Sequence, residues 1–165
     1  MTTHPAAGPI PAGYTTVTPW IISRDTAALI DFLKRAFGAE ELGRVTGEDG
    51  RIGHAEVRIG DAVVMMFDAL DEWIDTPAFL RLYVEDSEAT QRQALAAGAT
   101  EVTKQTELAF GDRVGRVLDP FGNLWWIQTR LEDLDYPEME RRMRDPKYIA
   151  AMEYVQSADI VPRKA

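Results

Sequence analysis

Hydrophobic and polar positions follow two different periods in the first half of the chain. The run TVTPWIISRD (16–25) is strand-like. TAALIDFLKRAFGAEEL then carries apolar side chains every three or four residues, as in a helix that ends at Gly38. GRIGHAEVRIGDAVVMMFD returns to a strand pattern, interrupted at Gly60-Asp61, a pair typical of a hairpin turn. These residues therefore predict a strand, a helix and a β-hairpin in that order.

The second half of the chain repeats this order. AFLRLYVEDS predicts a strand, EATQRQALAAGATEV predicts a helix that ends at Gly98, and GDRVGRVLDPFGNLWWIQT predicts two strands about a glycine turn. Three pairs of landmarks recur in the same order and at nearly equal spacing: Asp25 and Asp86, Gly38 and Gly98, Gly60 and Gly122. The repetition indicates two copies of a β-α-β-β-β module.

Each module forms a small sheet that its own helix can cover on only one face. We therefore expect an α+β fold in which paired β-α-β-β-β modules form a curved mixed sheet, with helices outside and a concave ligand cup inside. The expected segments are a flexible lead-in at 1–14, modules at 15–75 and 76–134, and a C-terminal helical extension at 135–165.

The C-terminal extension is expected to hold two helices, because Pro137 and the Asp145-Pro146 pair are typical of helix starts. The second helix carries an apolar stripe, formed by Tyr148, Ile149, Met152 and Val155. Through this stripe the helix either packs on its own domain or serves as a lid or a dimer arm.

Charge and composition narrow the choice of partners. Lys+Arg 18 against Asp+Glu 27 gives a net charge of −9, which disfavours nucleic acid and anionic lipid and favours a cationic ligand. The chain has no cysteine, which fits a reducing cytoplasm. No apolar run reaches the roughly 18 to 20 residues of a membrane span. We expect a cytoplasmic protein with a small-molecule ligand, and neither nucleic acid nor membrane as a partner.

Four segments of the chain carry a family resemblance: RDTAALIDFLKRAFGAE, IGHAEVRIGDAVVMM, LYVEDSEATQRQALAAGAT and GDRVGRVLDPFGNLWWIQTRLEDL. They resemble the vicinal oxygen chelate superfamily, also called glyoxalase/bleomycin resistance/dioxygenase, and within it the PhnB-like branch. The resemblance spans Thr15 to Leu134. It implies the paired-module fold, a ligand in the cup, frequent homodimers and, in many members, a divalent metal held by His, Gln or Glu.

The resemblance also locates the four metal-ligand positions of chelating members. They fall at Thr18, Met65 (or Met66 after a one-residue slip), Phe79 and Trp126. A divalent ion needs carboxylate or imidazole donors, and these side chains supply neither. The His that PhnB-like chains often carry is replaced by Asn123. We therefore expect no metal in the cup and no cofactor.

His54 is the remaining residue with evident chemistry. In GHAEVRIG, alternation places His54, Glu56 and Arg58 on one strand face. This row either faces solvent, with His54 simply hydrogen-bonded, or lies at the cup rim with His54 and Glu56 as an acid/base or ligand-orienting pair. Arg113 and Arg116 have opposite parity, so at most one faces the cup. Arg113 is a candidate to bind an anionic group there, with a structural ion pair as its alternative role.

Aromatic and methionine side chains form the better candidate site. On the expected parity, the cup face carries Trp20, Met65, Phe67, Phe79, Tyr83 and Trp126. Any one of them could be ordinary core, but together they indicate an aromatic-lined cavity in place of a metal centre. They favour a metal-free protein that binds an aromatic, cationic or amphipathic small molecule, as in drug or metabolite sequestration. The alternative is a glyoxalase-like lyase or isomerase, or another enzyme of this fold, that uses His54 and Glu56 or a non-standard metal site.

The adjacent residues Trp125 and Trp126 must face opposite sides of their strand. If Asp119–Gly122 is a turn and the strand begins at Asn123, Trp126 faces the cup and Trp125 packs beneath the helices. A one-residue slip would exchange the two roles.

The resemblance and the apolar stripe of the last helix predict a homodimer whose protomers bury strand edges or that helix. We expect light scattering at micromolar concentration to give about twice the chain mass of 18.5 kDa. A mass near 18.5 kDa would contradict the dimer. Removal of residues 137–165 is expected to weaken the dimer only if the final helix is the dimer arm.

Overall fold

The computed structural model describes residues 8–160, so the first seven residues of the expected lead-in lie outside the description. The chain divides into two compact units. The first comprises the chain up to Lys34 together with Gly38–Thr76, and the second comprises Arg35–Phe37 together with the chain from Pro77. Each unit contains one β-α-β-β-β repeat, which confirms the α+β class and the internal repetition. No helix among residues 8–160 is long and apolar enough to cross a membrane.

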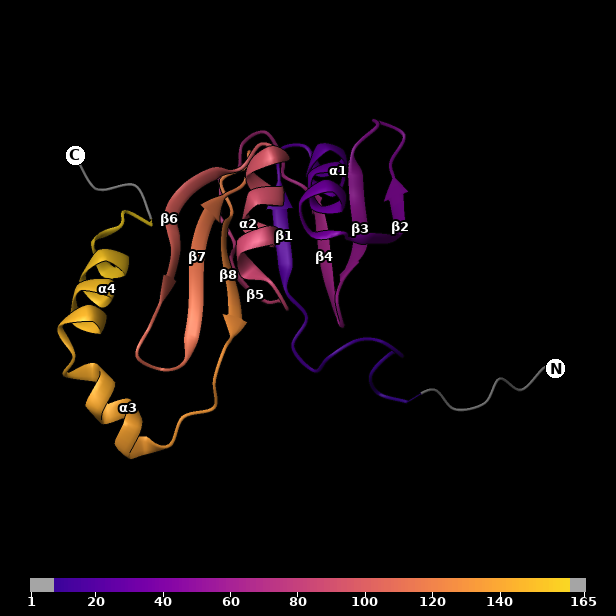
Figure 1. Ribbon diagram of the computed structural model, residues 1–165. Coiled ribbons are helices and arrows are strands. Elements are labelled where there is room, and N and C mark those ends of the chain that lie inside the picture. Colours follow the sequence, from indigo (N-terminus) through magenta and orange to yellow (C-terminus); the bar gives the residue numbers. More distant parts are fainter. Residues whose placement is uncertain (1–7, 161–165) are drawn as a thin grey trace. The chain divides into compact units, whose positions relative to one another are not determined.

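The first unit is built on a four-stranded mixed sheet (Figure 1). Its elements are β1 (Trp20–Ser23), α1 (Thr26–Phe37, of which Arg35–Phe37 belong to the second unit), β2 (Glu40–Thr46), β3 (Ile52–Ile59) and β4 (Ala62–Asp68). The strand order is β1-β4-β3-β2, in which β1 and β4 are parallel and the other pairs antiparallel. Asp25 caps α1 by accepting a hydrogen bond from the Ala28 N–H, and Gly38 ends the helix in a left-handed conformation.

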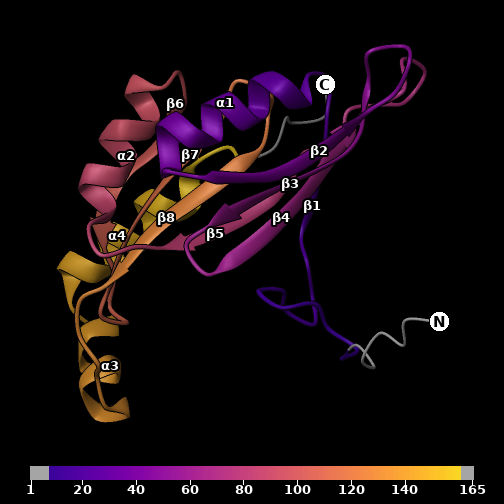
Figure 2. The same ribbon diagram turned by 90° about the vertical axis from the view of Figure 1, so that its right-hand side faces the viewer.

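One face of this sheet holds the core of the first unit. Ile21, Met66 and Ala55 are fully buried, and the register places them opposite one another on β1, β4 and β3. α1 lies along the sheet (Figure 2), with Leu29 and Leu33 buried. The alternate residues of these strands, which include Trp20 and Met65, are only partly covered and form the opposite face, called the open face of the first sheet below.

The second unit repeats this arrangement and adds two helices (Figure 1). Its elements are β5 (Phe79–Tyr83), α2 (Ser87–Ala96), β6 (Thr100–Glu107), β7 (Asp112–Leu118), β8 (Leu124–Arg130), α3 (Tyr136–Met143) and α4 (Pro146–Ser157). The strand order is β5-β8-β7-β6, with β5 and β8 parallel. Strand pairing is confined to each unit, so the expected curved sheet consists of two separate four-stranded sheets.

The hydrophobic pattern does not locate β2 and β6, although the module requires a strand at each place. Both are edge strands, and their pairing with β3 and β7 is irregular. β2 is exposed over most of its length. Because an exposed edge strand buries no continuous apolar row, it shows little of the alternation that identifies a half-buried strand.

Helices cover both faces of the second sheet. α2 packs on β6, β7 and β8, where Gly115 admits the Gln91 side chain; a Cβ on Gly115 would lie 1.9 Å from the Gln91 Oε1. α4 packs against β6, and its Val155 is buried together with Leu108 and Val114. Consistent with this double coverage, most of β7 is buried on both of its faces. Val155 and Met152 of the apolar stripe of α4 therefore pack on their own unit, while Ile149 remains 43% exposed.

A buried carboxylate sets the start of β8. Asp119 is 5% exposed and accepts hydrogen bonds from the N–H groups of Phe121 and Asn123, the Asn123 side-chain amide and the Trp125 Nε1–H, at 2.8 to 2.9 Å. The turn holds Gly122 at a positive φ, and β8 begins at Leu124, one residue later than expected. The expected alternation is confirmed, because Trp125 is 1% exposed while Trp126 points to the opposite face.

Replacement of Trp125 tests how much this packing contributes to the free energy of unfolding. Trp125→Ala should lower the free energy of unfolding by about 3 to 5 kcal/mol, the usual cost of truncating a buried Trp. Trp125→Phe should cost about 1 to 3 kcal/mol, because it keeps a ring but removes one hydrogen bond from a buried carboxylate. Urea denaturation measures both. The control is Trp20→Ala, whose side chain is 48% exposed and should matter less; an equal loss would contradict the assignment.

Candidate functional site

The open face of the first sheet carries a group of aromatic rings. Trp20 lies at its centre, with its ring centroid 5.7 Å from that of His54 and 5.5 Å from that of Phe67, both edge-on. The Phe67 ring in turn meets Trp73 at 6.2 Å. We call these four residues the aromatic cluster. Trp20 and Trp73 are 48% and 43% exposed, so the cluster presents apolar surface that the fold does not bury.

A cavity of about 390 Å³ adjoins the aromatic cluster. Its lining consists of Ile22, Glu72, Trp73, Ile74 and Thr76. The loop after β4 that forms most of this lining is held by Arg24, which binds Asp75 at 2.6 Å and donates hydrogen bonds to the carbonyl oxygens of Leu70 and Trp73. Two of these contacts are to the backbone, so the loop that carries Trp73 has support besides the Trp73 side chain.

A polar row crosses the same open face. The His54 Nε2 lies 2.9 Å from Glu56 Oε1, and the Tyr14 hydroxyl donates to Glu56 Oε2. These hydrogen bonds, that of Tyr14 first and then that of His54, hold the pKa of Glu56 below its ordinary value. The Glu56 contact likewise raises the pKa of Tyr14. Glu56 thus stays ionised and orients His54, whose side chain remains 37% exposed.

In the second unit, Trp126 lies between two arginines. Arg81 and Arg116 stand directly opposite Trp126 on the neighbouring strands β5 and β7. Their guanidinium carbons lie 4.6 and 3.8 Å from the Trp126 ring centroid, within the range of cation–π interaction. The net charge of the chain favours a cationic ligand. Beside Trp126, however, the two arginines make the local charge positive, which disfavours a cation there.

The other predicted residues of the second unit are divided between the two faces. Phe79 and Tyr83 share the face of Trp126 and are 54% and 66% exposed. With Leu80, Arg81, Trp126 and Ile160, Phe79 lines a cavity of about 280 Å³. Arg113 lies on the α2 side, where it binds Glu107 at 2.9 Å and Glu88 at 3.5 Å. The structure therefore separates Arg113 from Trp126 and gives it the contacts of the ion-pair alternative.

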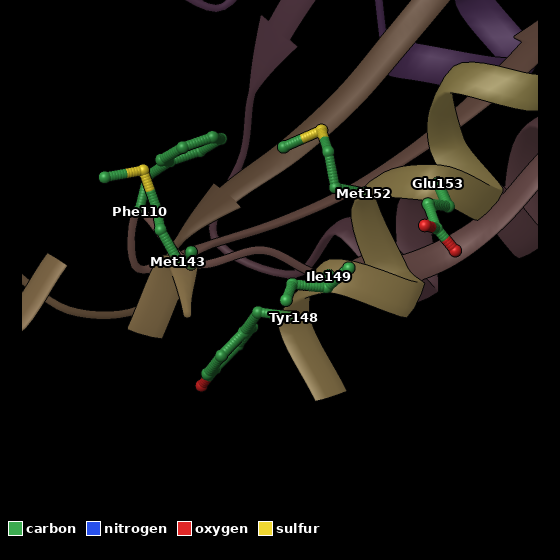
Figure 3. A pocket seen from close by; sticks show the side chains of 7 residues that line it. Phe110, Met143, Tyr148, Ile149, Met152 and Glu153 are labelled. Atoms are coloured by element: carbon green, nitrogen blue, oxygen red, sulfur yellow. The ribbon is translucent and has the colours of Figure 1, made fainter. Parts of the chain in front are cut away.

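A third cavity, of about 260 Å³, lies between the C-terminal helices and the β6–β7 turn (Figure 3). It is lined by Ala109, Phe110, Met143, Tyr148, Ile149, Met152 and Glu153. Part of the predicted apolar stripe of α4 therefore faces this cavity. Apart from Glu153, the lining offers no charged group.

The residues at the four predicted metal positions do not fit a divalent ion. Met65 shares the open face of the first sheet with Glu56, its partner on β3, and Glu56 already binds His54 and Tyr14. Trp126 is flanked by two guanidinium groups, which repel a cation. Within residues 8–160, no group of three or more His, Asp or Glu side chains is close enough to hold a metal.

Three residues of these sites escape the sequence reasoning. Tyr14 belongs to the segment taken as a lead-in, and Trp73 lies in a loop, where no periodicity indicates a face. Arg81 could have been found, because strand alternation places it on the same face as Phe79 and Tyr83.

The fold defines a class of proteins in which the chain contains two β-α-β-β-β modules, each with its own four-stranded sheet. A sequence model of the Glyoxalase/Bleomycin resistance protein/Dioxygenase superfamily matches residues 13–127, and the chain belongs to this superfamily. A Mycobacterium tuberculosis protein of uncharacterized function is 36% identical over 138 residues, covering 77% of this chain and 81% of its own.

Solved structures share the fold at lower sequence identity. TioX from Micromonospora sp. ML1 is 24% identical with a TM-score of 0.58, and the match covers 73% of this chain and all of TioX. The PhnB protein from Bacillus cereus is 15% identical with a TM-score of 0.55, and the match covers 70% of this chain and 99% of that protein. These likenesses concern the fold.

The hydrogen bonds of Glu56 predict a pH dependence of stability. Because its pKa is lowered in the folded protein, ionised Glu56 stabilises the fold above its ordinary value of 4.5, and this contribution is lost as the pH falls through the folded-state pKa. At pH 7, Glu56→Gln should lower the free energy of unfolding by about 1 kcal/mol. Urea denaturation should show this difference shrinking below pH 4.5.

The matched control is Glu48→Gln, which removes the same charge from the exposed turn between β2 and β3 of the same unit. It removes no contact of His54 or Tyr14, so it should not reproduce the effect at pH 7. If both variants change the free energy of unfolding at pH 7 equally, the hydrogen bonds of Glu56 make no measurable contribution to stability.

Proposed function

We propose that this protein binds a small aromatic or amphipathic molecule without a metal ion, on the sheet faces that carry its aromatic side chains. The aromatic cluster of the first unit carries the proposal. Its two tryptophans are about half exposed beside a cavity of about 390 Å³. Exposed apolar patches of this kind mark binding surfaces more often than they serve stability.

The surroundings of the aromatic cluster suit a ligand that has both a ring and a polar group. Trp20 and Phe67 offer ring edges and faces, and the half-exposed His54 offers a hydrogen-bonding nitrogen beside them. Sequestration of a drug or metabolite by a cytoplasmic homodimer is the role that fits this arrangement and the description of the superfamily.

A catalytic role is the second candidate, and the hydrogen bonds of His54 favour it. An imidazole oriented by an ionised carboxylate is a suitable general base, and here it lies beside a surface that can hold a ring. In this reading Glu56 orients His54, while Tyr14 holds Glu56 in place. The reaction would be a proton transfer on a ligand bound at the aromatic cluster.

Calorimetric titration with 2-naphthol in the presence of EDTA tests the binding proposal. We expect binding by the wild type, and a loss of roughly tenfold in affinity in Trp73→Ala, the weight of one aromatic contact. The Arg24 contacts to the loop backbone should keep this variant folded. The control is Tyr136→Ala, which removes a 70% exposed ring on α3 and should leave affinity unchanged.

Four results would count against the proposal. Absence of naphthol binding, or equal binding by Trp73→Ala, would contradict the site. Stoichiometric zinc, nickel, manganese or iron in the purified protein, together with loss of binding in EDTA, would contradict metal independence. Consumption of a bound ligand that stops in His54→Gln but continues in Trp73→Ala would favour the enzyme.

A further inference from the structure

Arg81 and Arg116 are two positive charges that stand opposite Trp126 on the neighbouring strands. Within residues 8–160, neither is in an ion pair, whereas Arg113 on the other face of the same sheet binds Glu107. Arg116 is 5% exposed, and the structure provides it with the Trp126 ring and one hydrogen bond, from its Nη1–H to the Val155 carbonyl at 2.7 Å. Its buried Nε–H has no acceptor.

This arrangement is electrostatically incomplete. Burial, and then the neighbouring charge of Arg81, lower the pKa of Arg116, so the folded protein disfavours its charged form. A buried charge is normally retained only when it is paired and hydrogen-bonded. The ring of Trp126 and one carbonyl offset part of this cost, and a bound anion would offset more.

A space for such an anion adjoins Arg81. Arg81 is exposed and lines the cavity of about 280 Å³ with Phe79, Leu80, Trp126 and Ile160. Among the described residues of this lining, Arg81 is the only charged one, and the other four residues are aliphatic or aromatic. Its volume is below that of drug-sized pockets, so it suits a compact ligand.

We propose that the second unit binds a small organic anion, with its carboxylate or other oxyanion on Arg81 and its apolar part against Phe79 and Ile160. Arg116 adds a fixed positive charge from beyond the Trp126 ring. The arginine fork matches the two oxygens of a carboxylate. The inference rests on the proposed binding function and specifies that the ligand at this site is negatively charged. The net charge of −9 on the chain would by itself favour a cation.

Calorimetric titration of the full chain with benzoate, benzamide and benzylamine tests the charge, because these probes share a ring and differ in charge. We expect benzoate to bind at least about tenfold more tightly than benzamide, and benzylamine to bind most weakly. Arg81→Gln should weaken benzoate binding about tenfold and leave benzamide unchanged. Arg81→Lys keeps the charge but loses the planar guanidinium group, so its affinity for benzoate should lie between those of the wild type and Arg81→Gln.

Two further variants separate a role in binding from a role in stability. Arg116→Met should weaken benzoate binding while leaving the melting temperature unchanged or raising it, because an unpaired buried charge is replaced by an apolar chain. Arg92→Gln removes an exposed charge from α2 on the other face of the sheet and should change neither.

Equal affinity for benzoate and benzamide, or an unchanged benzoate affinity in Arg81→Gln, would overturn the inference. The naphthol titration in the first unit keeps the two proposals apart. If naphthol binds but benzoate binds no more tightly than benzamide, only the proposed anion site is contradicted. Failure of all four probes would remove both proposals.

Discussion

The buried carboxylate of Asp119 holds the turn between β7 and β8 with four hydrogen bonds, two from backbone N–H groups and two from the side chains of Asn123 and Trp125. This turn sets the residue at which β8 begins. Since side chains alternate along a strand, the starting residue decides which tryptophan enters the core and which meets the arginines. A shift of one residue would bury Trp126 in place of Trp125. The contacts of Arg81 and Arg116 with the Trp126 ring would then be lost.

The two modules share a topology and differ in what covers their second face. In the first unit, that face carries an aromatic cluster and the hydrogen-bonded row of Tyr14, Glu56 and His54, and much of it is exposed. In the second unit, α4 covers the side of β6 and β7 but leaves the β5 side exposed, with Phe79, Arg81 and Tyr83. Coverage by α4 therefore divides one sheet face into a packed half and an exposed half, and the exposed half carries the proposed anion site.

This partial coverage also explains the charge of the second site. α4 buries Arg116 and supplies a carbonyl, a neutral acceptor, where an ion pair would need a carboxylate. Arg81, on the uncovered half, has the Trp126 ring as its contact. The two modules thus present different chemistry on equivalent faces: acidic and imidazole groups beside rings in the first, guanidinium groups beside a ring in the second.

The sequence by itself determined the repeated elements other than the edge strands β2 and β6, both C-terminal helices and the separation of Trp125 from Trp126, because the helical and strand periods are local properties of the chain. It also placed His54 and Glu56 on one face, which their spacing of two requires. Only the tertiary structure decided that Tyr14 contacts Glu56, that Trp73 joins Phe67 and that α4 buries Arg116. These contacts join residues distant in the chain, and they depend on strand order and loop paths, which no local period encodes.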